Sequence, residues 1–186
     1  FAAAGLCGVC LYYLLENIAL TFTLASNVGV IVSVSPFFTA LFTRFFGDKE
    51  PLRGRFFVGF AAAMAGIGLI SFWGSPVQVN PVGDLLSLGA AVMWGCYSVL
   101  TRKISGFGYT TVQTTRRVFA YGIAFMLPTL LFLDFRVDVA RFSEPENVLN
   151  ILFLGVGASA ICFVTWNFAV QVLGAVRTSV YIYVVP

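Results

Sequence analysis

One acidic residue, Glu16, lies inside a long apolar stretch of the sequence, where an unpaired charge is unexpected. An ionised carboxylate in hydrocarbon costs several kcal/mol, so this group must face water, pair with a cation or carry a proton. Tyr13, Asn17 and Thr21 share its face of a helix, given their spacing. The pattern predicts that Glu16 binds a positive group or exchanges a proton. The alternative is a position near the membrane surface, where Glu16 is solvated and has no function.

Polar and aromatic side chains also interrupt other apolar stretches. On a membrane helix a polar stripe should face protein or water rather than lipid. Hydrogen bonding between helices is an equal alternative for Ser and Thr, and packing is an alternative for the aromatic residues, whereas the larger amides favour a cavity. Pro36 removes a backbone hydrogen bond and predicts a kink, either static or part of a moving region. Together with Tyr13, Glu16 and Asn17, the cavity candidates are Ser35, Pro36, Trp94, Tyr97, Trp166 and Asn167.

The chain offers little for metal binding or enzyme chemistry. Cys7 and Cys10 have the spacing of redox or zinc motifs, but the sequence has no histidine and no second cysteine pair. We interpret the four cysteines as small packing residues. Without histidine or clustered carboxylates in the apolar stretches, neither a histidine triad nor a two-carboxylate site is available. We therefore expect no metal, no cofactor and no enzyme activity.

The elements that position these residues are helices long enough to cross a membrane. Hydrophobic residues make up 59% of the 186 residues and charged residues 10%, whereas a soluble domain carries about a quarter charged residues. The apolar stretches approach the ~20 residues that span a bilayer as a helix, and they do not alternate as strands do. They cover residues 1–22, 26–46, 53–73, 82–104, 115–134, 147–172 and 176–186. The sequence predicts an all-α integral membrane protein, a helical bundle of about seven transmembrane spans.

The basic residues predict how these spans are oriented. Lys and Arg fall on alternate connections, nine on one side and two on the other. The positive-inside rule makes the nine-residue side cytoplasmic, so Phe1 starts near the cytoplasm. The net charge of +3 therefore reflects orientation, and we expect no nucleic acid as a partner. The nine residues are Arg44, Lys49, Arg53, Arg55, Arg102, Lys103, Arg116, Arg117 and Arg177, against Arg136 and Arg141.

Local signals mark several helix boundaries. Asn80 followed by Pro81 predicts a helix start, with Asn80 as the capping residue. The residues from Ser143 to Glu146 fit a capping box ahead of the sixth span. The polar segment 47–51 predicts a short turn between the second and third spans.

The sequence also repeats itself at an offset of 150 residues. Asn17 falls over Asn167 and Pro36 over Pro186 without a gap, and both residue types are rare within membrane spans. The offset maps the first span onto the sixth, so the repeat unit has five spans. Because five is an odd number, the second copy crosses the membrane in the opposite sense.

An inverted repeat of this kind is the architecture of many secondary transporters. We expect ten helices in a 5+5 arrangement. Residues 1–73 would hold the last three spans of the first unit, and residues 82–186 the second unit, truncated within its fourth span. Both ends of the chain therefore look cut.

In their order and spacing, these features resemble the EamA type of the drug/metabolite transporter superfamily. The resemblance lies in the segments from Glu16 to Ser26, Ile31 to Phe38, Gly47 to Pro51, Gly83 to Lys103 and Trp166 to Pro186. It implies ten helices, cytoplasmic termini and a small metabolite moving through a central cavity between the repeats. Its last segment adds Tyr181 to the cavity candidates.

We therefore expect a secondary active transporter that exports a small metabolite, amino acid or drug-like compound by alternating access, with Glu16 as the candidate for proton coupling. One alternative is an exchanger of sugar phosphates or nucleotide sugars, whose anionic substrates call for basic residues deep in a span. Another is a membrane protein that transports nothing. The expected partners are a small-molecule substrate and the lipid bilayer, with a homodimer left open, and the expected location is the bacterial inner membrane.

Overall fold

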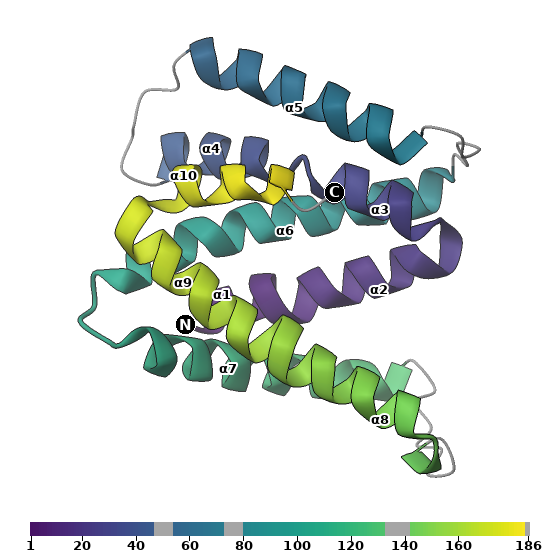
Figure 1. Ribbon diagram of the computed structural model, residues 1–186. Helices are drawn as coiled ribbons and strands as arrows, with labels where there is room; N and C mark the ends of the chain where they lie inside the picture. The colour runs from purple at the N-terminus through teal and green to yellow at the C-terminus, as the bar shows by residue number, and fades with distance from the viewer. Residues whose placement is uncertain (47–53, 73–79, 133–141, 185–186) are drawn as a thin grey trace.

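The computed structural model describes residues 1–46, 54–72, 80–132 and 142–184, which form helices and the short turns between them (Figure 1). No strand occurs in this part of the chain. The prediction of an all-α protein is confirmed for these residues.

Several of the long helical segments are built from two or three shorter helices. The first contains α1 (Ala2–Gly5), the π-helical turns η1 (Leu6–Leu11) and α2 (Tyr12–Phe22). The second contains α3 (Ala25–Val32) and α4 (Ser35–Phe46). They are followed by α5 (Gly54–Phe72), α6 (Pro81–Ser105) and α7 (Thr111–Phe132). The last described segments are α8 (Pro145–Leu152), the π-helical turns η3 (Phe153–Ile161), α9 (Cys162–Leu173), α10 (Ala175–Val180) and the 3₁₀ turn η4 (Tyr181–Val184).

Four of these segments are long and apolar enough to cross a membrane. They are Ala2–Phe22, Ala25–Phe46, Pro81–Ser105 and Pro145–Leu173. A shorter apolar helix covers Gly54–Leu69 within α5. Helices therefore lie in each of the seven predicted stretches, while length and composition support a membrane crossing for four of them.

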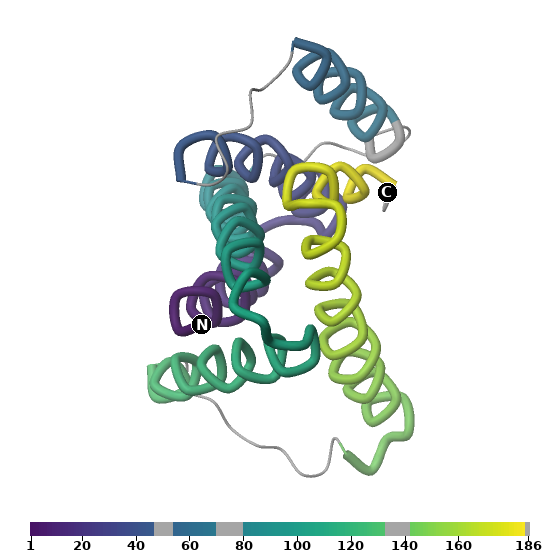
Figure 2. The backbone as a smooth tube through the Cα atoms, turned by 90° about the vertical axis from the view of Figure 1, so that its left-hand side faces the viewer, coloured from purple at the N-terminus to yellow at the C-terminus, as the bar shows by residue number. Residues whose placement is uncertain are grey.

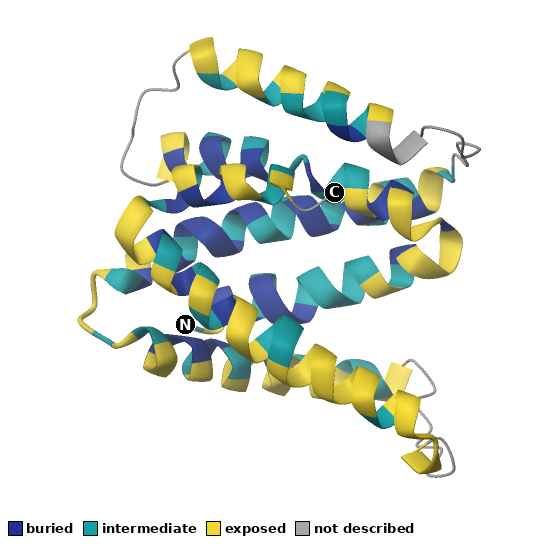
Figure 3. Ribbon diagram, in the orientation of Figure 1, coloured by how far each residue is buried: buried dark blue, intermediate teal, exposed yellow. Residues whose placement is uncertain are grey.

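Helix α6 lies at the centre of the bundle, in contact with α2, α3, α4 and α9 (Figures 1 and 2). Glycine residues permit the closest approaches between helices in the bundle. A Cβ atom on Gly95 would lie 2.9 Å from the Cβ of Phe38 and 3.1 Å from the backbone nitrogen of Thr39 on α4. Likewise, a Cβ on Gly5 would lie 2.6 Å from the backbone oxygen of Val118 on α7. Buried residues line these inner faces, and exposed residues cover the outer ones (Figure 3).

Large apolar side chains cover the outside of the bundle. Leu85, Leu131 and Phe153 are 70%, 84% and 70% exposed, respectively. A water-exposed surface rarely carries so much apolar area. Hydrocarbon is the solvent that suits this surface, in agreement with the composition.

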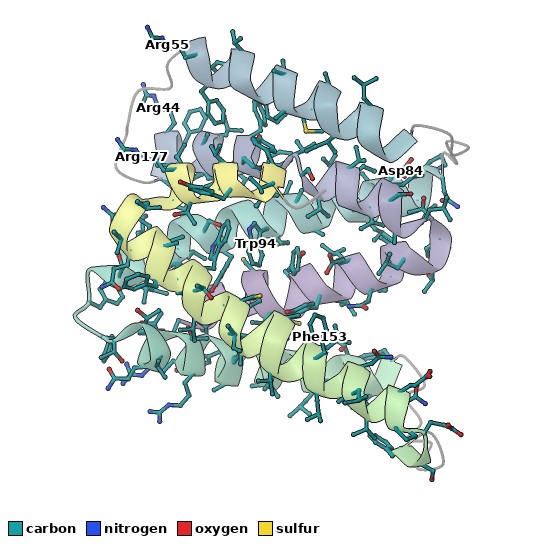
Figure 4. All side chains as sticks on the ribbon, viewed as in Figure 1. Arg44, Arg55, Asp84, Trp94, Phe153 and Arg177 are labelled. Atoms are coloured by element: carbon teal, nitrogen blue, oxygen red, sulfur yellow. The ribbon has the colours of Figure 1, made fainter. Side chains whose placement is uncertain are left out.

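The basic residues that the structure describes gather at one end of the bundle. Figure 4 shows Arg44, Arg55 and Arg177 together at that end, whereas Asp84 lies at the opposite end. The carboxyl end of α6 also belongs to the basic end, because Arg102 donates a hydrogen bond to the backbone oxygen of Gln171 (2.9 Å) near the start of α10. A cluster of Lys and Arg at one end of the bundle is the pattern that the positive-inside rule predicts.

The predicted helix boundaries have mixed outcomes. The cap at Asn80 is confirmed: its Oδ1 accepts hydrogen bonds from the backbone nitrogens of Val82 (3.1 Å) and Gly83 (3.2 Å). The capping box at Ser143 is wrong, because Glu144 occupies the N-cap position of α8 and its side chain makes no capping hydrogen bond. The turn predicted for residues 47–51, and Pro186, lie outside the described residues.

Candidate functional site

Two cavities meet at the three residues Tyr12, Glu16 and Trp94. One has a volume of about 400 Å³ and lies between α2, α3, α6 and η4. The other, of about 320 Å³, lies between α2, α6, η3 and α9. Volumes of this size are at the lower end of the range of small-molecule sites, about 300–1,000 Å³. Glu16, the strongest candidate from the sequence, therefore lies in the wall that both cavities share.

The carboxylate of Glu16 has one hydrogen-bond partner among the described side chains. The hydroxyl of Tyr12, one helical turn earlier, donates to its Oε1 over 3.0 Å. No described Lys or Arg lines either cavity. A half-buried carboxylate without a counter-cation needs water, a proton or a bound cation, so the polar chemistry of this site is centred on one acidic group.

Aromatic rings form most of the wall around this group. The Trp94 ring lies 4.9 Å from that of Tyr12 and 5.0 Å from that of Trp166, between ring centroids. Phe163 packs edge-on against Trp94 at 5.5 Å, and Tyr13 lies 5.4 Å from Tyr12. The labelled Trp94 lies at the middle of the bundle (Figure 4). The predicted candidates Tyr13, Trp94 and Trp166 are thus brought together with Glu16.

The larger cavity lies beside a break in the second helical segment. Helix α3 ends at Val32 and α4 begins at Ser35, and the backbone nitrogens of Val34 and Phe37 bond three residues back, to Ile31 and Val34. Ser35 lines the cavity, and its hydroxyl is buried with no hydrogen-bond partner among the described residues. Pro36 is buried beside it as the second residue of α4. The interruption predicted from Pro36 is therefore a short turn, Ser33 and Val34, between two helices of one helical segment.

Asn167 belongs to a buried hydrogen-bond network away from both cavities. Its Oδ1 accepts from the hydroxyl of Tyr97 (2.6 Å), and its Nδ2 donates to the hydroxyl of Thr115 (2.8 Å). Tyr97 and Asn167 are 0% and 3% exposed, respectively. The network joins α6, α7 and α9, so in this structure these two candidates hold helices together and line neither cavity.

Two further candidates lie apart from the cavities. Asn17 is exposed, and its Nδ2 donates to the backbone oxygen of Tyr13 (2.7 Å) in its own helix. Tyr181 is 65% exposed, while its neighbour Ile182 lines the larger cavity. The structure therefore does not bring Asn17 and Tyr181 to the Glu16 site.

The sequence interpretation missed three hydroxyl-bearing residues at the site. Tyr12, the hydrogen-bond partner of Glu16, could have been found, because residues four apart are neighbours on a helix. Ser26 and Ser33 line the larger cavity from α3 and its end. No pattern in the sequence distinguishes these serines from the many small polar residues that bond within their own helix.

Comparison with known proteins places the chain in a family. The model of the EamA-like transporter family matches residues 1–72 and 81–186. A crystal structure of a protein with 24% sequence identity shares the fold, with a TM-score of 0.69 over 98% of this chain and 63% of the other.

Curated relatives carry transporter names. An uncharacterized transporter of Archaeoglobus fulgidus is 29% identical over 98% of this chain and 62% of its own length. The uncharacterized transporter YyaM of Bacillus subtilis is 25% identical over 100% of this chain and 61% of its own length. A probable terminal-alkyne amino-acid exporter of Streptantibioticus cattleyicolor is 25% identical over 100% of this chain and 60% of its own length. The chain thus spans about three fifths of the relatives that it matches.

A helical bundle with an apolar surface and this family match define an integral membrane protein of a transporter family, not of an enzyme family. The chain belongs to the EamA-like transporter family. A lipid environment agrees with that membership and with the apolar outer surface of the bundle. The resemblance drawn from the sequence motifs is confirmed.

Proposed function

We propose that the protein is a secondary active transporter that exports a small metabolite, amino acid or drug-like compound by alternating access. The observation that carries the proposal is the placement of Glu16, a carboxylate without a described counter-cation, in the wall of two cavities inside a transporter bundle. In this mechanism Glu16 alternately binds a proton and the cationic group of the substrate. A bacterial inner membrane is the proposed location, in line with the bacterial and archaeal relatives.

Matched interruptions of the helices support the inverted 5+5 repeat. At the offset of 150 residues, the π-helical turns η1 (Leu6–Leu11) correspond to the end of η3 (Phe153–Ile161). The cap of α2 at Thr23 corresponds to Leu173, next to the cap of α9 at Gly174. Discontinuous helices in corresponding positions are typical of transporter sites.

The position of the larger cavity supports an outward-open state. Its lining residues Glu16, Ser26 and Ser33 belong to the halves of their helical segments that lie away from the basic end. Toward the basic end, α4 packs on α10, and Thr39 and Ser179 are fully buried there. With the basic end in the cytoplasm, we infer that the cavity opens outward and is closed inward.

The exchanger of sugar phosphates or nucleotide sugars remains the second candidate function. It would require a cationic group near the substrate, and neither cavity has a described basic residue in its wall. A carboxylate in that wall would repel an anionic substrate. The Glu16 site therefore favours the exporter.

The test is proton-coupled transport by the complete protein in everted membrane vesicles. The vesicles are energised to acidify their interior, and the loss of the pH gradient is followed by acridine fluorescence as amines and amino acids are added. We expect the wild type to dissipate the gradient with its substrate and Glu16→Gln to lose this response, because Gln cannot exchange a proton. Glu144→Gln removes an exposed carboxylate far from the cavities and should respond as the wild type does. Full coupled transport by Glu16→Gln would contradict the coupling role.

A further inference from the structure

The cavities around Glu16 indicate the chemical class of the substrate. The inference rests on the proposed transport function and concerns what the cavity binds. Glu16 supplies the negative charge of the site, and the hydroxyl of Tyr12 is its described hydrogen-bond donor. A ligand that enters this site therefore meets an anion with spare acceptor capacity.

Aromatic residues form part of the cavity walls beside the carboxylate. Trp94 lies between Tyr12 and Trp166, with centroid distances of 4.9 Å and 5.0 Å. Phe163 and Tyr13 extend the same wall into the smaller cavity. The electron-rich faces of Trp and Tyr favour a cation within ~6 Å of the ring, and aromatic cages are a recurrent site for quaternary ammonium groups.

The remainder of the lining is apolar and suits an uncharged body. Val30, Val32 and Ile182 line the larger cavity, and Leu154 and Ala158 line the smaller one. Apolar walls with a few convergent polar groups are the usual composition of a small-molecule site. One end of the ligand thus meets Glu16 and the rings, while the other meets aliphatic side chains.

We propose that the substrate is an organic ammonium ion with an apolar body, bound with its cationic group between the Glu16 carboxylate and the faces of Trp94 and Tyr12. A neutral ligand of the same shape would leave the carboxylate without a counter-ion. An anionic ligand would be repelled by Glu16. Charge therefore distinguishes this class from ligands that merely fit the apolar walls.

The test is calorimetric binding to the complete protein in detergent, which requires no transport. The probe is phenethyltrimethylammonium, compared with the uncharged hydrocarbon in which carbon replaces the nitrogen and with phenylpropionate. We expect the cation to bind at least about tenfold more tightly than either analogue. Glu16→Gln and Trp94→Leu should each weaken cation binding by at least about tenfold, while Glu144→Gln should leave it unchanged.

Equal binding of the cation and the hydrocarbon, or tighter binding of phenylpropionate, would overturn the proposal. Trp94→Phe keeps a ring at this position and should retain part of the affinity, which separates loss of the cage from loss of folding. The proposed transport cavity is tested separately, by the reaction of Gly29→Cys with a membrane-impermeant thiol reagent. If Gly29→Cys reacts from outside but the cation does not bind more tightly than its analogues, the proposed substrate class is wrong. The proposed transport cavity is then still supported.

Discussion

At Glu16 a carboxylate, a phenol and an indole meet in the wall shared by two cavities. The phenol of Tyr12 and the indole of Trp94 contribute differently to the surroundings of this carboxylate. Tyr12 donates a hydrogen bond that stabilises the ionised form, and Trp94 offers a ring face but no counter-charge. The missing positive charge is left for a proton or a ligand to supply.

The Asn167 network gives a prediction about stability at the residue scale. Asn167→Ala would leave the buried hydroxyls of Tyr97 and Thr115 without their amide partner. Hydrogen bonds between membrane helices contribute modestly, so we expect a loss of about 1–2 kcal/mol in the free energy of unfolding. Thermal unfolding in detergent measures it. Thr165→Ala, in the same helix but exposed, is the matched control, and an equal loss in both variants would contradict a structural role for the network.

Sequence reasoning identified the charged centre of the site better than its surroundings. Glu16 could be found because a carboxylate is rare in an apolar stretch, and Trp94, Trp166 and Tyr13 were found as aromatic or polar residues away from helix ends. Asn17 and Asn167 align at the offset of 150 residues, yet one is exposed and the other is buried. Their surroundings depend on which neighbouring helices are present, and the local sequence does not encode that.

At the scale of elements, helix breaks and glycine contacts position the site. The break before Ser35 provides a backbone turn beside the larger cavity, and the close approach of α6 to α4 at Gly95 holds Trp94 near it. Apolar length predicted where helices form, but not how they subdivide. The division of the second segment at Val32 and Ser35, and the π-helical turns in two others, result from packing and from backbone geometry around Pro36 and the small residues.

The contact between α1 and α7 gives a prediction at this scale. Gly5→Val would place side-chain atoms against the backbone of α7, where even a Cβ would lie 2.6 Å from the Val118 oxygen and 2.7 Å from the Gly122 nitrogen. Overpacking of this kind costs about 1–3 kcal/mol. We expect a lower unfolding temperature in detergent for Gly5→Val, and a smaller decrease for Gly5→Ala. A Cβ atom on Gly59 would have no described atom within 4 Å, so the control Gly59→Val should unfold at the wild-type temperature. If the unfolding temperature of Gly59→Val fell as far as that of Gly5→Val, the close contact between α1 and α7 would be contradicted.

For the whole molecule, the distribution of charge and the position of the cavity define a direction. Arg44, Arg55 and Arg177 lie at one end of the bundle. Glu16 belongs to the half of its helical segment that ends beside Thr23, which contacts Gly83 near Asp84 at the other end. The sequence predicted this polarity because Lys and Arg alternate between connections. It could not predict the packing of α4 on α10 toward the basic end, on which the proposed outward opening of the cavity depends.

Substituted-cysteine labelling of the complete protein tests whether the Glu16 cavity opens outward. In a background free of Cys7, Cys10, Cys96 and Cys162, Gly29→Cys places a thiol on the exposed cavity wall, and Thr39→Cys places one in the buried contact toward the basic end. We expect a membrane-impermeant thiol reagent applied outside intact cells to label Gly29→Cys and to leave Thr39→Cys unlabelled. Arg177→Cys should react only in everted vesicles, which verifies the orientation. Labelling of Gly29→Cys from the cytoplasmic side alone, or from neither side while Arg177→Cys reacts, would contradict an outward-open transport cavity at Glu16.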